Sequence, residues 1–539
     1  MRSFIVLVLS LFVSAAALAQ HDHAAAPPSP VMLDDGLSDL HWKVSTSNAE
    51  AQKFFDQGMR YLYAFNHEQA VRSFQHATEL DPDLAMGYWG AALALGPNIN
   101  LDVDPPREQQ AYDAVHAAAA HQEHASPMER DLIAALLKRY SKEPTVDLRK
   151  LAIDYSDAMR ETSKKYADDA NVATLYAESL MDLRPWKFWS HDGKPAEGTE
   201  EIVSTLESVL KKHPTHIGAN HYYIHAVEAS SHPERALPSA KRLETLAPAA
   251  GHLVHMPAHI YQRTGNYAGA ARANELGADV DRAFIKRNGA ESMYVGMYYN
   301  HNLQFGSASN AMIGKYDAAF AQASEMATNV EPMLKEMPIF EVIAAAPMFV
   351  NARFGRWQDV LRAKAVDAGP LSSTFSHFAR GVAFARLGNV SGAESEWKAL
   401  EAGRAKLGDD NGIMQNPPKP LGELASRVLA GRIAEARGDR DAAIAEYTKA
   451  VDAEVALNYD EPADWPWPVR ETLGAALLRA GRAADAEKVL RADLTANPNN
   501  PRSLWLLARS LHAQKKDGSR ATAEFKKEWR GGALELNDL

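Results

Sequence analysis

Residues 54–82 of the chain, FFDQGMRYLYAFNHEQAVRSFQHATELDP, contain the pattern that decides the fold. Small residues at Gly58 and Ala70 stand where two antiparallel helices would have to approach each other closely. The aromatic ring of Phe74 is placed to fill the space between those helices. Pro82 ends the second helix, because proline has no backbone N–H and its ring clashes with the preceding turn. The stretch therefore predicts a hairpin of two helices.

The same pattern returns nearer the C-terminus, as GRIAEARGDRDAAIAEYTKAV at 431–451 and LGAALLRAGRAADAEKVLRADLTANPNNP at 473–501. Alanine-rich helical patterns fill most of the remaining chain, and no stretch alternates convincingly between apolar and polar residues with a period of two. Over most of its length the chain resembles a tetratricopeptide-repeat (TPR) protein. The resemblance implies an all-α fold of TPR-type helical hairpins stacked in a superhelix, an α-solenoid.

The resemblance further implies that the first helix of each hairpin lines a concave groove and the second faces outward. Successive repeats in this family are about 34 residues long. Ala236 and Ala270 occupy the same small-residue position in two successive repeats, which sets this offset between them. Under the offset, two pairs of histidines coincide at groove-facing positions. They are His221 with His255 and His225 with His259.

Residues four apart on a helix lie one turn apart on the same face, so each pair of histidines can chelate one ion. Further residues of metal-binding type fall at groove-facing positions of the same repeats or their neighbours. They are Glu228, His252, His301, Glu178 and Asp182. Imidazole and carboxylate without sulfur suit a divalent transition metal, namely Zn, Fe, Mn or Cu. The pattern predicts one metal site across two adjacent first helices, with Glu228 as its acidic member.

Two other interpretations of the histidines stay open. The groove could bind a peptide or small molecule through polar residues without a metal, as TPR grooves do for a peptide carboxylate. The usual residues for that purpose are Lys, Arg and Asn, whereas histidines and acids stand here. The histidines could also be structural, hydrogen-bonded within the repeats or stacked on Tyr222, Tyr223 and Tyr261.

Composition excludes several functional classes. The 539 residues carry a formal net charge of −11, which disfavours a nucleic-acid partner, because phosphates require clustered Lys and Arg. The chain has no cysteine, so disulfides, thiolate metal sites and cysteine nucleophiles are excluded together. It also contains no glycine-rich phosphate loop, nucleophile elbow or dinucleotide fingerprint.

The N-terminus, MRSFIVLVLSLFVSAAALAQ, combines Arg2, an apolar run and the small residues Ala17 and Ala19. This predicts a signal peptide cleaved after Ala19 and a periplasmic or secreted protein of bacterial type. No membrane span is expected, because the apolar run is shorter than the roughly 20 residues that cross a bilayer. The predicted segments are a signal peptide at 1–19, a disordered leader at 20–45, N-terminal repeats at 46–125, central repeats with the histidines at 126–335, and C-terminal repeats at 336–530.

The sequence thus predicts an exported TPR-repeat protein whose concave groove binds a protein, peptide or small-molecule ligand next to a His/carboxylate metal site. The alternative is a metal-dependent enzyme, a hydrolase or an oxygenase, built on the same scaffold. The sequence assigns no catalytic residue, and whether the protein is an enzyme is left open.

Overall fold

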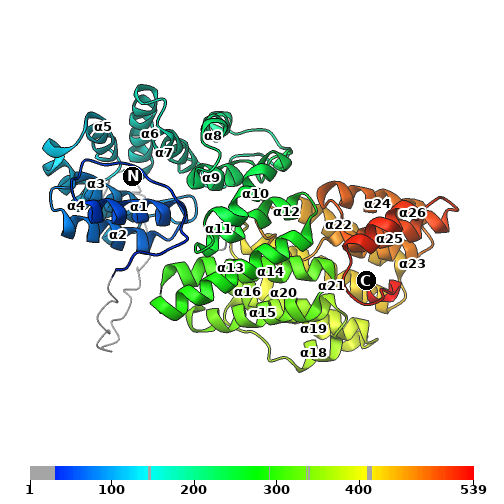
Figure 1. Cartoon of the computed structure of the whole chain (residues 1–539). Helices are drawn as coiled ribbons and strands as arrows, with labels where there is room; N and C mark the ends of the chain where they lie inside the picture. Colours follow the sequence, from blue (N-terminus) through cyan, green and yellow to red (C-terminus); the bar gives the residue numbers. More distant parts are fainter. Residues whose placement is uncertain (1–30, 144–146, 290–291, 336, 338–339, 410–414) are drawn as a thin grey trace, which may run out of the picture.

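The structure is a computed structural model that describes residues 31–143, 147–289, 292–335, 337, 340–409 and 415–539. Within these residues the chain is built of α-helices with short 3₁₀ and π segments, and no β-strand is formed beyond two isolated bridges. The predicted all-α solenoid is therefore confirmed for the described chain (Figure 1). The predicted signal peptide, residues 1–19, lies outside the described residues.

Successive α-helices pair as hairpins along the chain. Their bounds are α1 (Ala49–Tyr63), α2 (His67–Leu80), α3 (Ala85–Leu95), α4 (Pro105–Ala120), α5 (Pro127–Leu136), α6 (Leu148–Lys165), α7 (Ala170–Met181), α8 (Thr199–Lys212), α9 (Ile217–Val227), α10 (Leu237–Leu246), α11 (Gly251–His255), α12 (Pro257–Arg263), α13 (Tyr267–Asn288), α14 (Asn300–Ile313), α15 (Tyr316–Val330), α16 (Glu341–Ala344), α17 (Ala346–Arg353), α18 (Trp357–Arg362), α19 (Pro370–Arg386), α20 (Val390–Arg404), α21 (Pro418–Ala436), α22 (Arg440–Val455), α23 (Val469–Arg479), α24 (Ala483–Ala496), α25 (Pro501–Ala513) and α26 (Ser519–Glu528).

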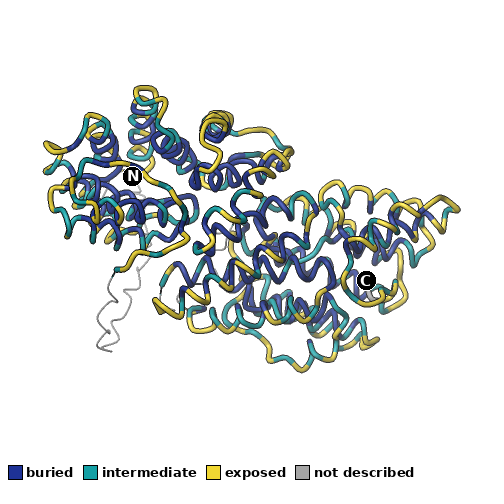
Figure 2. Tube along the Cα trace, viewed as in Figure 1, coloured by how far each residue is buried: buried dark blue, intermediate teal, exposed yellow. Residues whose placement is uncertain are grey.

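Small residues set how closely the helices pack. A Cβ atom added to Gly58 on α1 would lie 2.5 Å from the Phe74 ring, and one added to Gly90 on α3 would lie equally close. The ring of Phe74 is fully buried between these two helices. One aromatic side chain therefore fills the space within a hairpin and the space to the next hairpin. The helices are buried where they pack against one another, and the exposed residues gather at the outer turns (Figure 2).

The turn inside most hairpins holds one residue in the left-handed region, which favours glycine. Glycine occupies this position in turns such as Gly265 (φ 79°) and Gly438 (φ 81°). Two turns differ, because Phe65 stands there with φ 56° and Lys515 with φ 60°. A large side chain in this conformation is strained, and such strain is often retained where the side chain is needed for function.

Helices from both ends of the chain pack against the central hairpins. In the N-terminal half, α1 packs against α9, so the first hairpin contacts the helix that carries His221. In the C-terminal half, α25 contacts α14, and the Arg530 N–H donates to the Ile313 carbonyl at 2.7 Å. Figure 1 shows α9 to α14 in green between the blue N-terminal and red C-terminal helices. The central hairpins are therefore enclosed from two directions.

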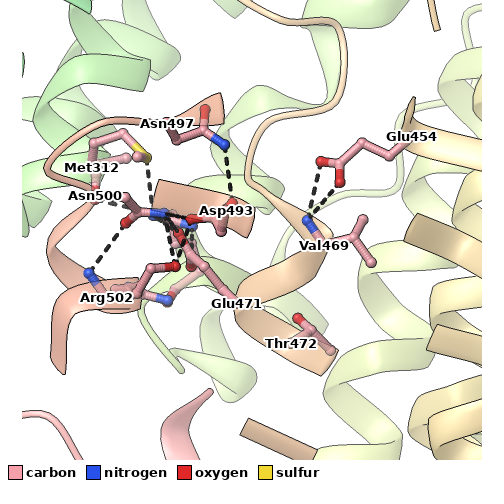
Figure 3. Close-up of polar contacts among 12 residues, drawn as sticks. Met312, Glu454, Val469, Glu471, Thr472, Asp493, Asn497, Asn500 and Arg502 are labelled. Carbon is pink, nitrogen blue, oxygen red and sulfur yellow. Dashed lines mark hydrogen bonds and ion pairs between the residues drawn. The ribbon is translucent and has the colours of Figure 1, made fainter. Parts of the chain in front are cut away.

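A buried polar network fixes the C-terminal hairpins on the central ones (Figure 3). The Arg353 guanidinium of α17 pairs with the Glu471 carboxylate of α23 at 3.2 Å, and both side chains are almost completely buried. The Asn500 amide donates to Glu471 at 3.0 Å and to Asp493 at 2.8 Å. Because a buried charge without a partner is costly, these contacts tie α17, α23, α24 and α25 to one arrangement.

The predicted disordered leader differs from the structure over its second part. Leu37, Trp42 and Val44 are buried against the repeats, and the Trp42 indole N–H donates to Asp169 at 3.2 Å. These apolar residues follow a stretch that is polar overall. Burial of their side chains stabilises this segment against the repeats. Residues 20–30 of the leader lie outside the described residues. Among the described helices, every one is too short or too polar to cross a membrane.

Two glycine-to-alanine substitutions should separate the cost of the left-handed turn from the cost of disturbing the contact between Gly265 and Pro498. A Cβ at Gly438 meets open space, so Gly438→Ala should cost only the left-handed strain, about 1–2 kcal/mol. A Cβ at Gly265 would lie 2.3 Å from the Pro498 carbonyl oxygen, so Gly265→Ala should cost about 1–3 kcal/mol more. Urea unfolding of the two variants measures this difference. Equal losses would show that the Gly265 turn does not contact Pro498.

Candidate metal centre

Three consecutive hairpins bring six histidines together, each from the first helix of its hairpin. They are His221 and His225 on α9, His252 and His255 on α11, His259 on α12, and His301 on α14. The first helix of the middle hairpin is interrupted before Pro257, which lacks the N–H that would continue the ladder. Met256 keeps helical angles, φ −50° and ψ −34°, so the imidazoles on either side of the break still share one face.

The first triad consists of His221, His225 and His252. The Nε2 atom of His221 lies 3.1 Å from Nε2 of His225 and 3.1 Å from Nε2 of His252. All three side chains are buried, and their ligand nitrogens lie within 4.8 Å of one another. This is the spacing expected of three nitrogens that converge on one point.

The second triad consists of His255, His259 and His301. Nε2 of His255 lies 2.8 Å from Nε2 of His259, and the His301 ring lies 4.8 Å from the His255 ring. The ligand nitrogens of this triad also lie within 4.8 Å of one another. His255 and His259 are buried, whereas His301 is partly exposed.

Glu228 lies between the two triads and is completely buried. One carboxylate oxygen accepts from Nδ1 of His225 at 2.7 Å, and the other accepts from Nδ1 of His259 at 2.5 Å. Burial alone would raise the pKa of Glu228, but the neighbouring His259 and His225 outweigh it and hold that pKa below its usual range. Glu228 is therefore a carboxylate that orients one imidazole in each triad.

The Nδ1 atoms of two other histidines also have fixed acceptors. Nδ1 of His221 donates to the Tyr63 carbonyl at 2.7 Å. Nδ1 of His255 donates to Oδ1 of Asn274 at 2.6 Å, and the Asn274 amide group is oriented by its bond to the Ala270 carbonyl. A hydrogen bond at one ring nitrogen sets the tautomer of an imidazole. In His221 and His255 the Nδ1 proton is therefore donated to a fixed acceptor, and Nε2 carries a lone pair.

In two places the Nε2 atoms of neighbouring histidines face each other. The distance is 3.1 Å between His221 and His225 and 2.8 Å between His255 and His259. Burial, followed by the neighbouring imidazole, places the pKa of His221 and of His255 well below the usual range, so neither ring carries a second proton. Nitrogens about 2.0–2.1 Å from one ion lie about 2.8–3.4 Å apart at right-angle to tetrahedral geometry. The observed spacing fits a shared cation.

Aromatic rings shield both triads. The Phe65 ring lies 4.5 Å from His221 and 5.5 Å from His252, and the Phe305 ring lies 4.9 Å from His259. Phe65 is the residue that replaces glycine in the left-handed turn of the first hairpin. Sequence reasoning missed it, although a phenylalanine where other turns have glycine was a usable signal.

The other two predicted residues, Glu178 and Asp182, lie apart from the imidazoles and belong to neither triad. Asp182 forms a buried ion pair with Arg139. Burial, and then the charge of Asp182, raise the pKa of Glu178 well above its usual value. Asp182 lines the same cavity as the triads, but its carboxylate is paired with Arg139, which comes from another hairpin.

A cavity of about 820 Å³ reaches the centre. Both triads contribute to its wall, through His225 and His252 from the first and His259 and His301 from the second. The remaining wall combines polar and charged residues with apolar and aromatic ones. It includes Trp186, Met297, Tyr298, Phe340 and Ile343.

The C-terminal repeats also reach the centre. Tyr459 lies after α22, and its hydroxyl donates to Glu461 at 2.7 Å and lies 3.4 Å from the Glu228 carboxylate. Glu461 lines the cavity, and burial raises the pKa of its carboxyl to about 7. A segment about 200 residues away from the histidines in sequence therefore completes the site, which no local pattern could have indicated.

No model of a known protein family matches the chain, and no curated protein matches it. Solved structures do. The human IFIT1 dimer with PPP-AAAA is 13% identical with a TM-score of 0.32, over 90% of this chain and 91% of that one. Yeast Tom70 is 11% identical with a TM-score of 0.28, over 87% and 90%. The Cut9–Hcn1 hetero-tetramer is 13% identical with a TM-score of 0.32, over 86% and 76%. Similarity at this level carries no inference about what the chain binds.

The metal-free protein should tolerate loss of His252 better than loss of His216. Among the described residues His252 makes one side-chain polar contact, with His221, and its Nδ1 has no partner. His216, equally buried but outside the triads, bonds Asn171 and caps α9 through the Ala219 N–H. In the presence of a chelator, His252→Leu should cost less than about 1 kcal/mol and His216→Leu about 2 kcal/mol. Thermal unfolding compares them, and equal losses would contradict the assignment of His252.

Proposed function

We propose that the protein is a metal-dependent binding protein that holds transition-metal ions at the two histidine triads and presents a small-molecule ligand to them. The convergence of the Nε2 atoms carries this proposal. These atoms lie 2.8 and 3.1 Å apart within the two triads, and a cation bound between them would take them as ligands. The aligned Nδ1 protons are the arrangement that orients metal-bound histidines.

The wall of the cavity favours a small ligand over a nucleic acid. Its charged residues are mixed, and carboxylates outnumber cations. They are Asp102, Glu108, Asp182, Asp460 and Glu461 against Arg139, Arg149, Arg184 and Lys187. Such a wall does not neutralise a phosphate backbone. A ligand of moderate size with apolar and polar parts fits a cavity of about 820 Å³.

A metal-dependent enzyme on this scaffold is the second candidate. It is favoured by one observation, that imidazoles of both triads line the cavity wall. An ion with three protein ligands and an open position towards a cavity can polarise a bound ligand or activate water or dioxygen. Turnover of a ligand, rather than its retention, would distinguish the enzyme from the binding protein.

Metal uptake should depend on the triads and not on histidine in general. Purified without an affinity tag, the protein should contain transition metal, and His255→Ala or His221→Ala should reduce its content strongly while helicity is retained. His76→Ala is the control, because His76 is bonded to Glu79 on the outer face of α2. Elemental analysis with circular dichroism measures both properties. A folded wild-type protein that takes up no metal would refute the proposal.

Glu228→Gln should weaken binding without removing a ligand. The amide keeps the shape of the side chain but can accept from only one of the two Nδ1 groups, so one imidazole loses its orientation. Loss of such a partner lowers metal affinity by about 10–100-fold. Competition with a chromophoric chelator measures the change. An affinity equal to that of the wild type would show that Glu228 does not orient the imidazoles.

We further propose that the protein is exported and matures by cleavage after Ala19, on the evidence of the N-terminal sequence. Expressed with its native N-terminus in a bacterial host, it should be recovered from the periplasm with Gln20 as its first residue. Ala19→Arg should block processing, because the cleavage site requires a small residue. Intact mass and N-terminal sequencing test this. Recovery of the unprocessed wild-type chain from the cytoplasm would contradict it.

A further inference from the structure

We propose that the centre binds two copper ions, one in each triad, and that the ligand they take up together is dioxygen. This inference rests on the proposed function, because it assumes that the imidazoles bind metal. It adds the number of ions, their identity and the class of the shared ligand.

The geometry points to two ions rather than one. The six histidines form two sets of three with no residue in common, each with its ligand nitrogens within 4.8 Å. A third group, His225, Glu228 and His259, meets the same spacing and links the two sets. Glu228 contacts one histidine of each triad, always at Nδ1, so it leaves both sets of Nε2 atoms free. The triads are also adjacent, since the rings of His225 and His259 lie 5.3 Å apart.

The charge of the centre favours copper. Each triad offers three imidazoles and no carboxylate ligand, because both Glu228 oxygens are used by Nδ1 groups. Divalent ions at both positions would bring twice the charge of two Cu(I) ions into a place where His221, His255 and Glu228 are completely buried. Uncompensated buried charge is costly. Mn and Mg prefer carboxylate oxygens, whereas copper accepts imidazole readily.

Both ions would open onto one space, because each triad contributes two histidines to the cavity wall. A diatomic ligand in that space can contact both ions. Each Cu(I) can release one electron, and two electrons reduce one O₂ to the oxidation level of peroxide while both ions become Cu(II). The step balances without another reductant. The rings of Phe65 and Phe305 keep one side of each triad apolar, which limits the access of water.

Anaerobic titration of the untagged, chelator-stripped protein with Cu(I) tests the number of ions. The wild type should bind two Cu(I) per chain. The double variant His221→Ala/His252→Ala, in the first triad, and the double variant His255→Ala/His301→Ala, in the second, should each bind one. His76→Ala should bind two. The wild-type measurement needs no variant, so a folding defect in a variant does not decide the result.

Exposure of the copper-loaded protein to air tests the shared ligand. The wild type should take up one O₂ per two copper ions and give little Cu(II) electron paramagnetic resonance signal, because two bridged Cu(II) ions couple magnetically. Each one-triad variant should give the full signal of an isolated Cu(II) ion. A wild type with the full uncoupled signal, or with one ion per chain, would overturn the dicopper inference.

Zinc titration separates the two levels of the proposal. If the triads bind Zn(II) but not Cu(I), or a single ion that depends on the same histidines, the proposed metal-dependent function stands and the dicopper inference fails. If the folded protein binds neither copper nor zinc, both fail.

Discussion

The bonds of one buried carboxylate organise the centre. Glu228 begins the turn after α9, and its two oxygens reach His225 on its own helix and His259 on the next first helix. Its backbone carbonyl also accepts from Arg263, at the end of α12, at 2.9 Å. The same residue therefore aligns an imidazole of each triad and fixes two neighbouring hairpins against each other. Without it, two buried Nδ1 groups would lose their acceptor, which is costly for a buried polar group.

The curvature of the solenoid supplies the other contacts that the imidazoles need. Because α1 packs against α9, the turn of the first hairpin delivers the Tyr63 carbonyl and the Phe65 ring to the first triad. Phe65 does this from a left-handed backbone that glycine adopts at lower cost. The packing of its ring on His221, His252 and Tyr222 offsets that strain. A straight array of the same repeats would leave this triad open to water.

The fold and the main members of the centre were predictable from sequence, because both follow from local spacing. The small and aromatic positions of residues 54–82 describe a hairpin, and the offset of 34 residues between His221 and His255 brings equivalent faces together. The residues that orient the imidazoles were not predictable in this way. The carbonyl of Tyr63 has no side-chain signal at all, and Asn274 lies on α13, a second helix that the groove pattern does not describe.

Glu178 and Asp182 show the limit of the same reasoning. A repeat offset predicts which face of a helix a residue occupies, but it does not predict which charge the next hairpin brings to that face. Here Arg139 forms an ion pair with Asp182. The connection between α7 and α8 is also long, so this hairpin departs from the repeat length of about 34 residues. The distinction matters for the chemistry, because it leaves both triads without a carboxylate ligand. A centre of imidazoles around one orienting carboxylate offers an ion little negative charge, so an ion of low charge, or one that brings an anionic ligand with it, is buried there at lower cost.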